Sequence, residues 1–495
     1  MGEVSHASTQ SEKNDVFYYI NVVIMLLFMF GFPQLSPLGP LTEQGMAAVG
    51  IFLGLLWAWT FVDFIWPSIL GMVAIGLTGF MTIDEAFASG FGNSTTLTIV
   101  FVFALAAYMT STGVCKTVAY WFVSRKSCIG KPYLFMFYLL TSCYILGATA
   151  GTVATYVIAW AVIYEIAHIT DYKMGDSFPA SLLVGAVFSA MLGATVFLFR
   201  PFAVIALNNS KQILGMDCSF IDWAIPSFVA SYGALLLYVL VIKFIIRPDV
   251  ERLKTEDDIF ATFRAQVKVT GEQKVAFVTM IAIILFASIP SFLPAGSAPR
   301  VWLSKFTIGP IIALVMGITY AIHKKGKPLM DYAKSMKEGI DWQTIIMLAS
   351  SMPLGTMMQS PESGVSKLIN DFLVVFLGDY SPIVVSILFI AFTLIVTQVA
   401  HNMIMMVVLA PIVCNLSVSM GFNPMPCLMM LAFAANTGLA TPGASVMGAM
   451  IFANRKWIPI KDAFGYSWLA VGACLITTCL LGIPLAFAMD VGYMM

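Results

Sequence analysis

Charged residues are scarce in this sequence. Asp, Glu, Lys and Arg make up only 11% of the 495 residues, and 26 basic residues balance 26 acidic ones. Soluble domains carry about 25% charged residues, so the composition excludes an ordinary soluble protein. The absence of net positive charge also excludes a dedicated nucleic-acid binder, because such proteins neutralise phosphates with an excess of Lys and Arg.

Motifs for catalysis and for tightly bound metals are missing as well. The eight cysteines form no CxxC pair, and the four histidines lie scattered at positions 6, 168, 323 and 401. The sequence contains no GxxxxGK[ST] phosphate loop, no HExxH zinc motif and no GxSxG elbow. We therefore expect no enzyme activity and no resident cofactor, and an integral-membrane enzyme is the least favoured class.

Apolar residues, in contrast, are abundant. They make up 59% of the chain, and the mean hydropathy is +0.89. Membrane-spanning helices need about 20 consecutive apolar residues, and the pattern predicts an all-α polytopic membrane protein. Eleven crossings are expected, near residues 17–32, 45–61, 65–80, 95–112, 180–209, 222–246, 274–290, 305–322, 342–358, 425–452 and 463–489.

Two further apolar stretches, 132–168 and 382–418, are too long for a single crossing. Each is interrupted near its middle, by ATAGT at 148–152 and by TQVAHNM at 397–403. This pattern predicts two re-entrant hairpins. Irregular backbone inside a membrane is tolerated only where protein or a water-filled cavity surrounds it, so we expect a binding site at the hairpin tips.

The two halves of the chain resemble each other. Residues 98–122 and 344–372 are each an apolar helix, a Ser/Thr–Gly break and an amphipathic segment, and 38 residues separate Gly113 from Gly151 and Gly364 from Asn402. After each hairpin comes a helix interrupted by proline, 180–209 and 425–452. With the predicted number of crossings, the two copies enter the membrane from opposite sides. Such inverted repeats are common in secondary transporters.

The repeat predicts how the chain is divided into parts. These parts are a tail (1–16), scaffold helices (17–80), a first repeat (81–246), a connector (247–274), further scaffold helices (275–322) and a second repeat (323–495).

The basic residues predict the orientation in the membrane. With a cytoplasmic N-terminus, 21 of the 26 Lys and Arg fall on the cytoplasmic side, as the positive-inside rule requires. The C-terminus is then on the opposite side.

A helix broken inside the membrane offers unpaired amides to an anion and unpaired carbonyls to a small hard cation. The second half fits this pattern best, with Thr397, Ala400, His401 and Asn402 at the hairpin tip. Ala440, Thr441 and Pro442 follow at the helix break. Tight packing of small residues is the alternative explanation for each position taken singly.

Two ionisable residues fall within the predicted membrane region. Arg200 either holds an anionic substrate through a forked contact, or it bonds the free carbonyls of its own broken helix or extends along the cavity. His401 is either a neutral, hydrogen-bonded side chain or a residue of a proton-linked step.

The chain resembles the divalent anion:sodium symporter family. The resemblance spans roughly residues 45–490 and rests on GFGNSTTLTIVFVFALA (90–106) followed by STG, on DWQTIIMLASSMPLG (341–355), on LAPI (409–412) and on ATP (440–442). Asn402 lies nine residues before Pro411, the spacing of the Ser-Asn-Thr signature in this family. Ala150-Gly151-Thr152 occupies the first signature, with Trp160 in place of the proline.

The resemblance implies two sodium sites and a substrate site. The second sodium site would use Thr397, Ala400, His401, Asn402, Ala440 and Thr441. The first would retain only Ala150, Gly151 and Gly193, because FRPFA (199–203) replaces the family's Gly-Thr-Pro-Pro-Asn break. Substrate would contact Gly151, Thr152, Arg200, Asn402, Met403 and Pro442. We therefore expect Arg200 to supply a fixed positive charge in place of one sodium ion.

The function expected from these patterns is secondary transport of a small anion. The substrate would be a dicarboxylate, a tricarboxylate or a sulfate-like oxyanion, coupled to sodium and carried by an elevator movement. A cation/proton antiporter or a metalloid-anion permease of the same superfamily is the alternative. The resemblance implies a homodimer, and we expect it in the plasma (inner) membrane, in contact with membrane lipid.

Overall fold

The computed structural model describes residues 16–254, 264, 267, 269–294, 297–303 and 305–494. The predicted tail therefore lies outside the described residues apart from Val16, as does much of the predicted connector between 255 and 268. The described chain is almost entirely helical and has only four strands, each of two residues. This confirms the predicted all-α class.

Nine helices in the described part of the chain are long and apolar enough to cross a membrane. They correspond to Val16–Gln34, Glu43–Phe61, Ser94–Ser111, Pro132–Thr149, Thr152–Ile169, Phe220–Ile246, Gly271–Phe292, Asn402–Met420 and Ile460–Ala488. Two predicted crossings are shorter than expected, because α3 (Trp66–Leu77) has 12 residues and α15 (Ile308–Ala321) has 14. At 1.5 Å per residue neither spans a bilayer core of about 30 Å on its own.

The chain divides into two compact units. The first contains residues 1–97, 341–380 and 411–422. Its helices are η1 (Leu27–Gly31), η2 (Phe32–Gln34), α2 (Glu43–Phe61), α3, α4 (Ile83–Phe91), α17 (Trp342–Gln359), η6 (Pro361–Ser363) and α18 (Val365–Leu377). Side-chain hydrogen bonds cap the N-termini of several of these helices. Thr42 caps α2, Asp341 caps α17, and Thr82 with Glu85 forms a capping box at α4.

The second unit contains residues 98–340, 381–410 and 423–495. Its elements up to the connector are α5 (Ser94–Ser111, from residue 98), α6 (Val114–Val123), η3 (Lys126–Cys128), α7 (Pro132–Thr149), α8 (Thr152–Ile169), α9 (Ser177–Gly193), α10 (Pro201–Leu214), β1 (Met216–Asp217), α11 (Phe220–Val241), η4 (Ile242–Ile246) and η5 (Glu251–Lys254).

After the connector this unit continues to the last described residues. The elements are α13 (Gly271–Phe292), α14 (Ala298–Leu303), α15, β2 (His323–Lys324), β3 (Lys327–Pro328), α16 (Tyr332–Gly339), α19 (Pro382–Val396), α20 (Asn402–Met420, up to residue 410), α21 (Met425–Ala435), α22 (Val446–Ala453), α23 (Ile460–Thr477), η7 (Thr478–Gly482), α24 (Ile483–Ala488) and β4 (Tyr493–Met494). Strands β1 and β4 pair antiparallel, as do β2 and β3.

The order of elements in the first half recurs in the second. Helices α5, α6, α7, α8, α9 and α10 have counterparts in α17, α18, α19, α20, α21 and α22. Gly113 precedes α6 and Gly364 precedes α18, and both have a left-handed backbone, with φ of 73° and 70°. A residue with a side chain is strained in this conformation, so the same glycine-dependent break stands at corresponding places in the two halves.

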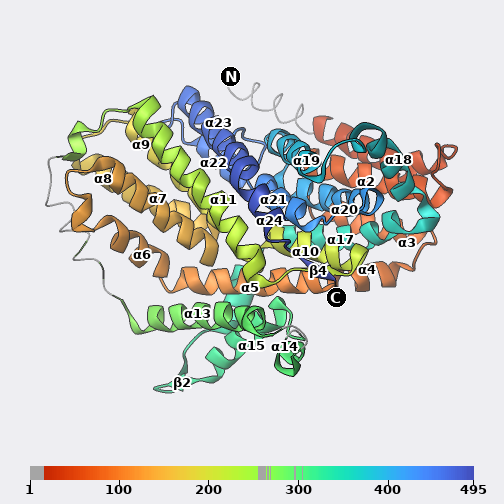
Figure 1. Ribbon diagram of the computed structural model, residues 1–495, viewed down its shortest axis with the longest axis horizontal. Coiled ribbons are helices and arrows are strands. Elements are labelled where there is room, and N and C mark those ends of the chain that lie inside the picture. Colours follow the sequence, from red (N-terminus) through yellow and green to blue (C-terminus); the bar gives the residue numbers. More distant parts are fainter. Residues whose placement is uncertain are drawn as a thin grey trace, which may run out of the picture. The chain divides into compact units, whose positions relative to one another are not determined.

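The first hairpin, α7 and α8, packs on α9 through close backbone contacts (Figure 1). A methyl group on Gly147 would overlap the Ala190 carbonyl, and one on Gly193 would overlap the Tyr144 carbonyl. The indole of Trp160 donates a 2.9 Å hydrogen bond to the Leu183 carbonyl. Small residues and side-chain hydrogen bonds are the usual means of joining helices in a membrane.

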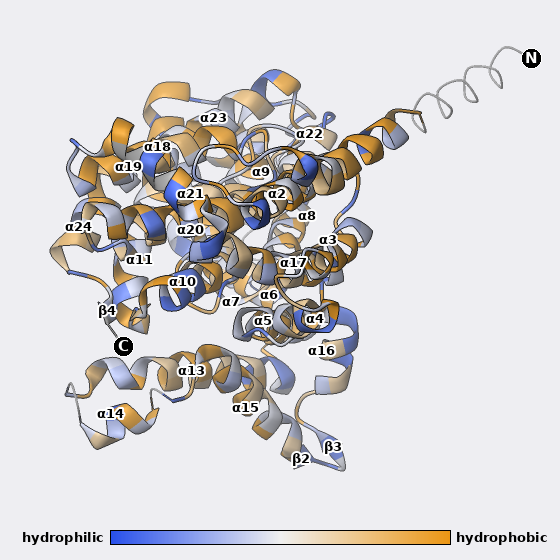
Figure 2. Ribbon diagram, turned by 90° about the vertical axis from the view of Figure 1, so that its right-hand side faces the viewer, coloured by the Kyte–Doolittle hydropathy of each residue, from blue (hydrophilic) through white to orange (hydrophobic). Residues whose placement is uncertain are grey.

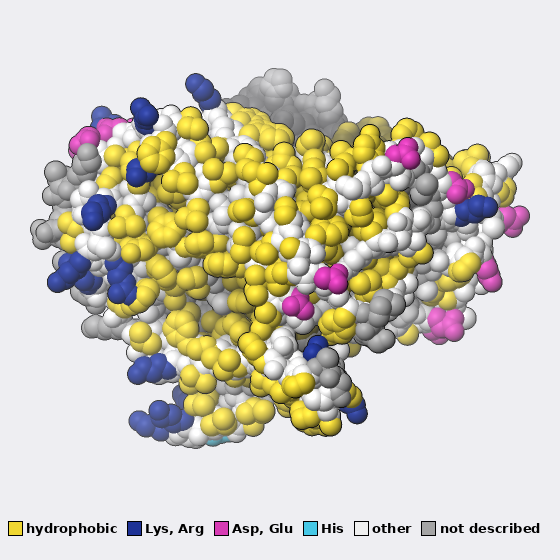
Figure 3. All heavy atoms as spheres, viewed as in Figure 1, with side chains coloured by type: hydrophobic (Ala, Val, Ile, Leu, Met, Phe, Trp, Pro, Cys, Tyr) yellow, Lys and Arg dark blue, Asp and Glu magenta, His cyan; other side chains and the backbone are white. Residues whose placement is uncertain are grey.

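The surface agrees with a membrane environment. Figure 2 shows hydrophobic colouring along most helices, with hydrophilic segments at α16 and at the β2–β3 turn. Large apolar side chains are exposed, among them Val278 and Phe292 on α13 and Val375 on α18, at 66%, 75% and 78%. Figure 3 shows hydrophobic side chains covering much of the visible face. Exposed apolar surface of this extent is costly in water and favourable in lipid.

Candidate functional site

The first hairpin turns where the sequence predicts it. Helix α7 ends at Thr149, Ala150 is extended and buried, and α8 begins at Thr152 with Gly151 as its N-cap. No side chain caps this helix start. The first amides of a helix have no partner within the helix and carry partial positive charge, so this tip suits an anion.

Arg200 lies against this tip. It precedes α10, its side chain is buried, and its Nη1 donates a 2.9 Å hydrogen bond to the Ala150 carbonyl. Its Nη2 lies 3.4 Å from the Thr152 hydroxyl. The predicted alternative, in which Arg200 bonds carbonyls of its own broken helix, is therefore wrong for these two nitrogens, because both reach the first hairpin.

No acidic residue in the described part of the chain neutralises the positive charge of Arg200. No ion pair among the described residues includes Arg200, and its buried Nε has no hydrogen-bond partner. A buried cation without a paired anion is unfavourable. The guanidinium is therefore in place to receive an anion beside Thr152.

The other residues predicted for the first cation site have different surroundings. Gly193 faces the backbone of α7 at Tyr144, where it allows close packing. The Gly151 carbonyl accepts hydrogen bonds from the Thr155 amide and hydroxyl, at 3.1 and 2.9 Å. The Ala150 carbonyl already accepts from Arg200. The Arg200 guanidinium thus lies against the Ala150 carbonyl, one of the groups predicted for the first cation site.

The second hairpin turns at residues 397–401, between α19 and α20. Thr397 is fully buried, and its hydroxyl donates a 3.0 Å hydrogen bond to the Ala435 carbonyl at the end of α21. The backbone N–H of Asn402 donates a 3.1 Å hydrogen bond to the Ala444 carbonyl. The tip is thereby bonded to both ends of the break between α21 and α22.

The residues around this tip differ in their hydrogen bonds and in their burial. The His401 carbonyl accepts from the amides of Ile404 and Met405, at 3.0 and 3.4 Å, in the first turn of α20. Ala400 is half-buried, and its amide donates to Val396. Met403 is buried and donates its amide to Asn402 Oδ1 at 2.8 Å, so this amide is occupied.

Gln398, which the sequence analysis did not single out, is central to this tip. Its buried Oε1 accepts from the amides of Leu439 and Ala440, at 3.1 and 2.9 Å. Its Nε2 donates to the carbonyls of Leu394 and Thr437, at 2.8 and 3.0 Å. One side chain thus satisfies three backbone groups of the break, those of Thr437, Leu439 and Ala440, and one carbonyl in the last turn of α19. A glutamine within the apolar run LIVTQVAHN was the available signal.

The break itself brings carbonyl oxygens together. A Cβ atom on Gly438 would lie 3.0 Å from the Thr397 carbonyl oxygen and 3.1 Å from that of Ala444. The Thr441 hydroxyl donates to the Gln398 carbonyl. Ala440 is buried, Thr441 is half-buried and Pro442 is exposed. Hard cations prefer such oxygen ligands, and unwound backbone supplies them in transporters.

Side-chain metal ligands are not gathered in the described residues, which contain no group of three or more His, Cys, Asp or Glu able to hold a metal ion. Any cation bound at the second tip would therefore depend on carbonyl and hydroxyl oxygens. Each of Thr397, Asn402, Ala440 and Thr441 makes a hydrogen bond between this tip and the break: Thr397 bonds Ala435, Asn402 bonds Ala444, and Ala440 and Thr441 both bond Gln398.

The two tips are linked indirectly. Within the described part of the chain no hydrogen bond joins Thr152 to Asn402. Instead, Asn436 Nδ2 donates a 2.6 Å hydrogen bond to the Met191 carbonyl, from the end of α21 to the last turn of α9. Helix α10 also packs against α21. All these residues belong to the second compact unit.

Comparisons with known proteins agree with this arrangement. The family model for the sodium:sulfate symporter transmembrane region matches residues 66–490. An uncharacterized transporter of Haemophilus influenzae is 20% identical over 472 residues, covering 92% of this chain and 93% of that protein. The sodium-dependent dicarboxylate transporter SdcS of Staphylococcus aureus is 22% identical over 455 residues, covering 89% and 85%.

A solved structure shares the fold. The YdaH transporter of Alcanivorax borkumensis superimposes with a TM-score of 0.57 at 12% identity, covering 90% of this chain and 98% of that one. The family match extends over both hairpins and both broken helices. The protein is thus a multi-pass membrane transporter, and it belongs to the divalent anion:sodium symporter family, the family of the sodium:sulfate symporters.

Proposed function

We propose that the protein couples the transport of a small dianion, foremost a dicarboxylate, to the sodium gradient. The observation that carries this proposal is the buried Arg200 guanidinium, which lies beside Thr152 and the uncapped start of α8 and has no carboxylate partner among the described residues. A substrate carboxylate would supply the missing negative charge through a charge-assisted hydrogen bond. The dicarboxylate transporter from Staphylococcus aureus supports this substrate class.

Sodium coupling would depend on the second tip. The carbonyls of Thr397 and Ala444 converge beside Gly438, and we assign the coupling ion to this place, with Ala400, Asn402, Ala440 and Thr441 around it. In the first half, Arg200 donates a hydrogen bond to the Ala150 carbonyl. One sodium ion would therefore accompany the substrate, and Arg200 would provide the fixed charge that a second ion would otherwise bring.

An elevator movement fits the division of the chain. The first hairpin, the tip of the second, both broken helices and every residue assigned to binding lie in the second unit, although α20 passes into the first unit from residue 411. A site that moves intact requires its binding residues to share one unit. The family resemblance supports a homodimer in the plasma membrane with a cytoplasmic N-terminus. Arg125 and Lys126, between α6 and the first hairpin, share a pocket with Arg264 of the connector, which supports the placement of these two basic segments on one side of the membrane.

Uptake by purified protein in proteoliposomes tests the proposal. We expect sodium-driven uptake of labelled succinate, strong loss in Arg200→Ala and partial recovery in Arg200→Lys, because an ammonium cannot form the forked contact. Arg300→Ala is the matched control, since Arg300 Nη1 also donates to a backbone carbonyl, that of Leu293, outside the site. Unaltered uptake in Arg200→Ala would refute the assignment.

The same vesicles distinguish the competing substrates and ions. Excess citrate or sulfate that abolishes succinate uptake would identify the preferred anion class. Uptake driven by a proton gradient without sodium would favour a proton-linked step at His401. Sodium-dependent uptake that persists when the proton gradient is collapsed would exclude that step.

A further inference from the structure

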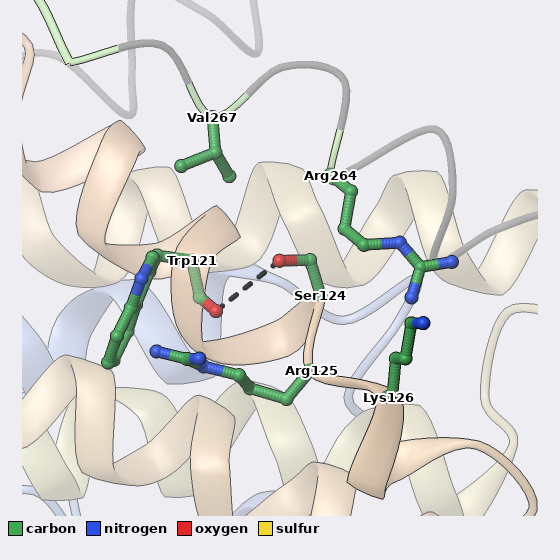
Figure 4. A pocket seen from close by; sticks show the side chains of 6 residues that line it. All are labelled: Trp121, Ser124, Arg125, Lys126, Arg264 and Val267. Carbon is green, nitrogen blue, oxygen red and sulfur yellow. Dashed lines mark hydrogen bonds between the residues drawn. The ribbon is translucent and has the colours of Figure 1, made fainter.

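A pocket of about 370 Å³ lies beside the end of α6, away from the hairpin tips (Figure 4). Its volume falls within the range of about 300–1,000 Å³ that is typical of small-molecule sites. Its lining comes from the end of α6, from the turn into η3 and from the connector between the repeats, as Trp121, Ser124, Arg125, Lys126, Arg264 and Val267.

The described lining of this pocket is basic. Of the six lining residues that the structure describes, three are basic and none is acidic. No ion pair among the described residues includes Arg125, Lys126 or Arg264. Figure 4 shows the guanidinium of Arg264 and the ammonium of Lys126 pointing toward each other. Like charges held close together repel, so an anion between them would stabilise the arrangement.

Arg264 adds a second observation. Its Nη1 is shielded from solvent and has no hydrogen-bond partner. Leaving such a charged donor unsatisfied is costly, because it has lost water without gaining an acceptor. An oxyanion in the pocket would accept from this nitrogen and from Lys126 together.

Arg125 is held in a fixed orientation nearby. Its guanidinium lies over the Trp121 ring, with Cζ 3.3 Å from the ring centroid, a cation–π contact that favours a parallel arrangement. The Ser124 hydroxyl, which donates to the Trp121 carbonyl at 3.3 Å, lies between Arg125 and Val267 in Figure 4. The side chain of Arg125 is thus ordered before any ligand arrives, which lowers the entropic cost of binding.

We propose that this pocket binds a phosphate group, separately from the transported anion. Three cations suit the two negative charges of a phosphate monoester better than the single charge of a carboxylate, and arginine forks match phosphate oxygens. Both lining segments belong to regions that the positive-inside rule places in the cytoplasm. The phosphate is carried there by a soluble metabolite or by the headgroup of an anionic lipid, whose attraction to basic residues is general.

Binding of two probes to the full-length protein tests this site and separates the two sources. The soluble arm measures equilibrium binding of radiolabelled glycerol 3-phosphate to protein in phosphatidylcholine nanodiscs. The lipid arm measures retention of phosphatidylglycerol against phosphatidylcholine by native mass spectrometry. The pocket variant is Arg125→Gln with Lys126→Gln and Arg264→Gln. The matched control removes three basic residues from the exposed β2–β3 turn, as Lys324→Gln, Lys325→Gln and Lys327→Gln.

We expect at least tenfold weaker binding of one probe by the pocket variant and unchanged binding by the control, since lost charge-assisted hydrogen bonds have effects of this size. Glycerol 3-phosphate as the affected probe would identify a soluble ligand, and phosphatidylglycerol would identify a lipid. Equal binding of both probes by the two variants would overturn the proposal. If the triple variant does not fold, Arg264→Gln alone is compared with Lys324→Gln, with the same expectation.

Discussion

The side-chain amide of Asn436 donates a 2.6 Å hydrogen bond to the carbonyl of Met191, and so it joins residues 245 positions apart. Asn436 is the C-cap of α21, and Met191 lies in the last turn of α9. These helices are counterparts in the two repeats. This buried hydrogen bond therefore joins the broken helices of the two repeats, and we expect it to help hold the two binding regions in position.

Replacing Asn436 with leucine should destabilise the protein. The Met191 carbonyl would remain buried without its donor, at a cost of about 1–3 kcal/mol. Thermal unfolding of the purified protein measures this change, and succinate uptake should fall with it. In Asn209→Leu the lost bond runs only to the Ile205 carbonyl of the same helix, so little change is expected. Equal stability of the two variants would contradict the role given to Asn436.

Gly193 and Gly151 should respond differently to alanine. At Gly193 the added methyl group would overlap the Tyr144 carbonyl, so α9 must move away from α7. Overpacking of this kind costs about 1–3 kcal/mol. At Gly151 the nearest atoms lie 4.0 Å from the added carbon, and the fold should tolerate it. Unfolding temperatures measure both effects. A weaker apparent affinity for succinate in Gly151→Ala, at unchanged stability, would place Gly151 at the substrate.

Gln398→Glu should destabilise the second hairpin tip and lower the affinity for sodium there. A carboxylate has the shape of the amide but cannot donate to the carbonyls of Leu394 and Thr437, which Nε2 now satisfies. The loss of two buried donors should cost at least about 2 kcal/mol and should raise the sodium concentration needed for half-maximal uptake several-fold. Gln212→Glu, an exposed position on α10, provides the control. An unchanged sodium requirement would show that Gln398 does not support the cation site.

Hydrophobic length and spacing were sufficient to predict much of the fold. The interruptions in two overlong apolar runs correctly located Ala150-Gly151 and residues 397–401 as the turns between α7 and α8 and between α19 and α20. Local breaks of this kind depend on small and polar residues within a few positions. The lengths of α3 and α15 were overestimated at their ends, because α3 stops before Thr78 and the left-handed Gly79, and α15 begins only after its N-cap Thr307.

The hydrogen-bond partners of the site residues could not be predicted from the sequence. Arg200 was recognised as a charge in the membrane, but nothing in the sequence shows that its guanidinium reaches Ala150, 50 residues earlier. Gln398 and Asn436 were missed because each stands beside a threonine in a short polar stretch, and the sequence does not show which of the polar residues reaches a distant partner. Their roles depend on which backbone groups the fold leaves unpaired nearby, and this becomes visible only in three dimensions.

The replacement of one sodium ion by Arg200 is tested most directly by the sodium dependence of succinate uptake in proteoliposomes. Initial rates are measured over a range of sodium concentrations at constant ionic strength and fitted for the Hill coefficient. With the Ala150 carbonyl occupied by Arg200, one sodium ion should act and the coefficient should be about one. A coefficient clearly above one would show that a further sodium ion binds and would contradict this account.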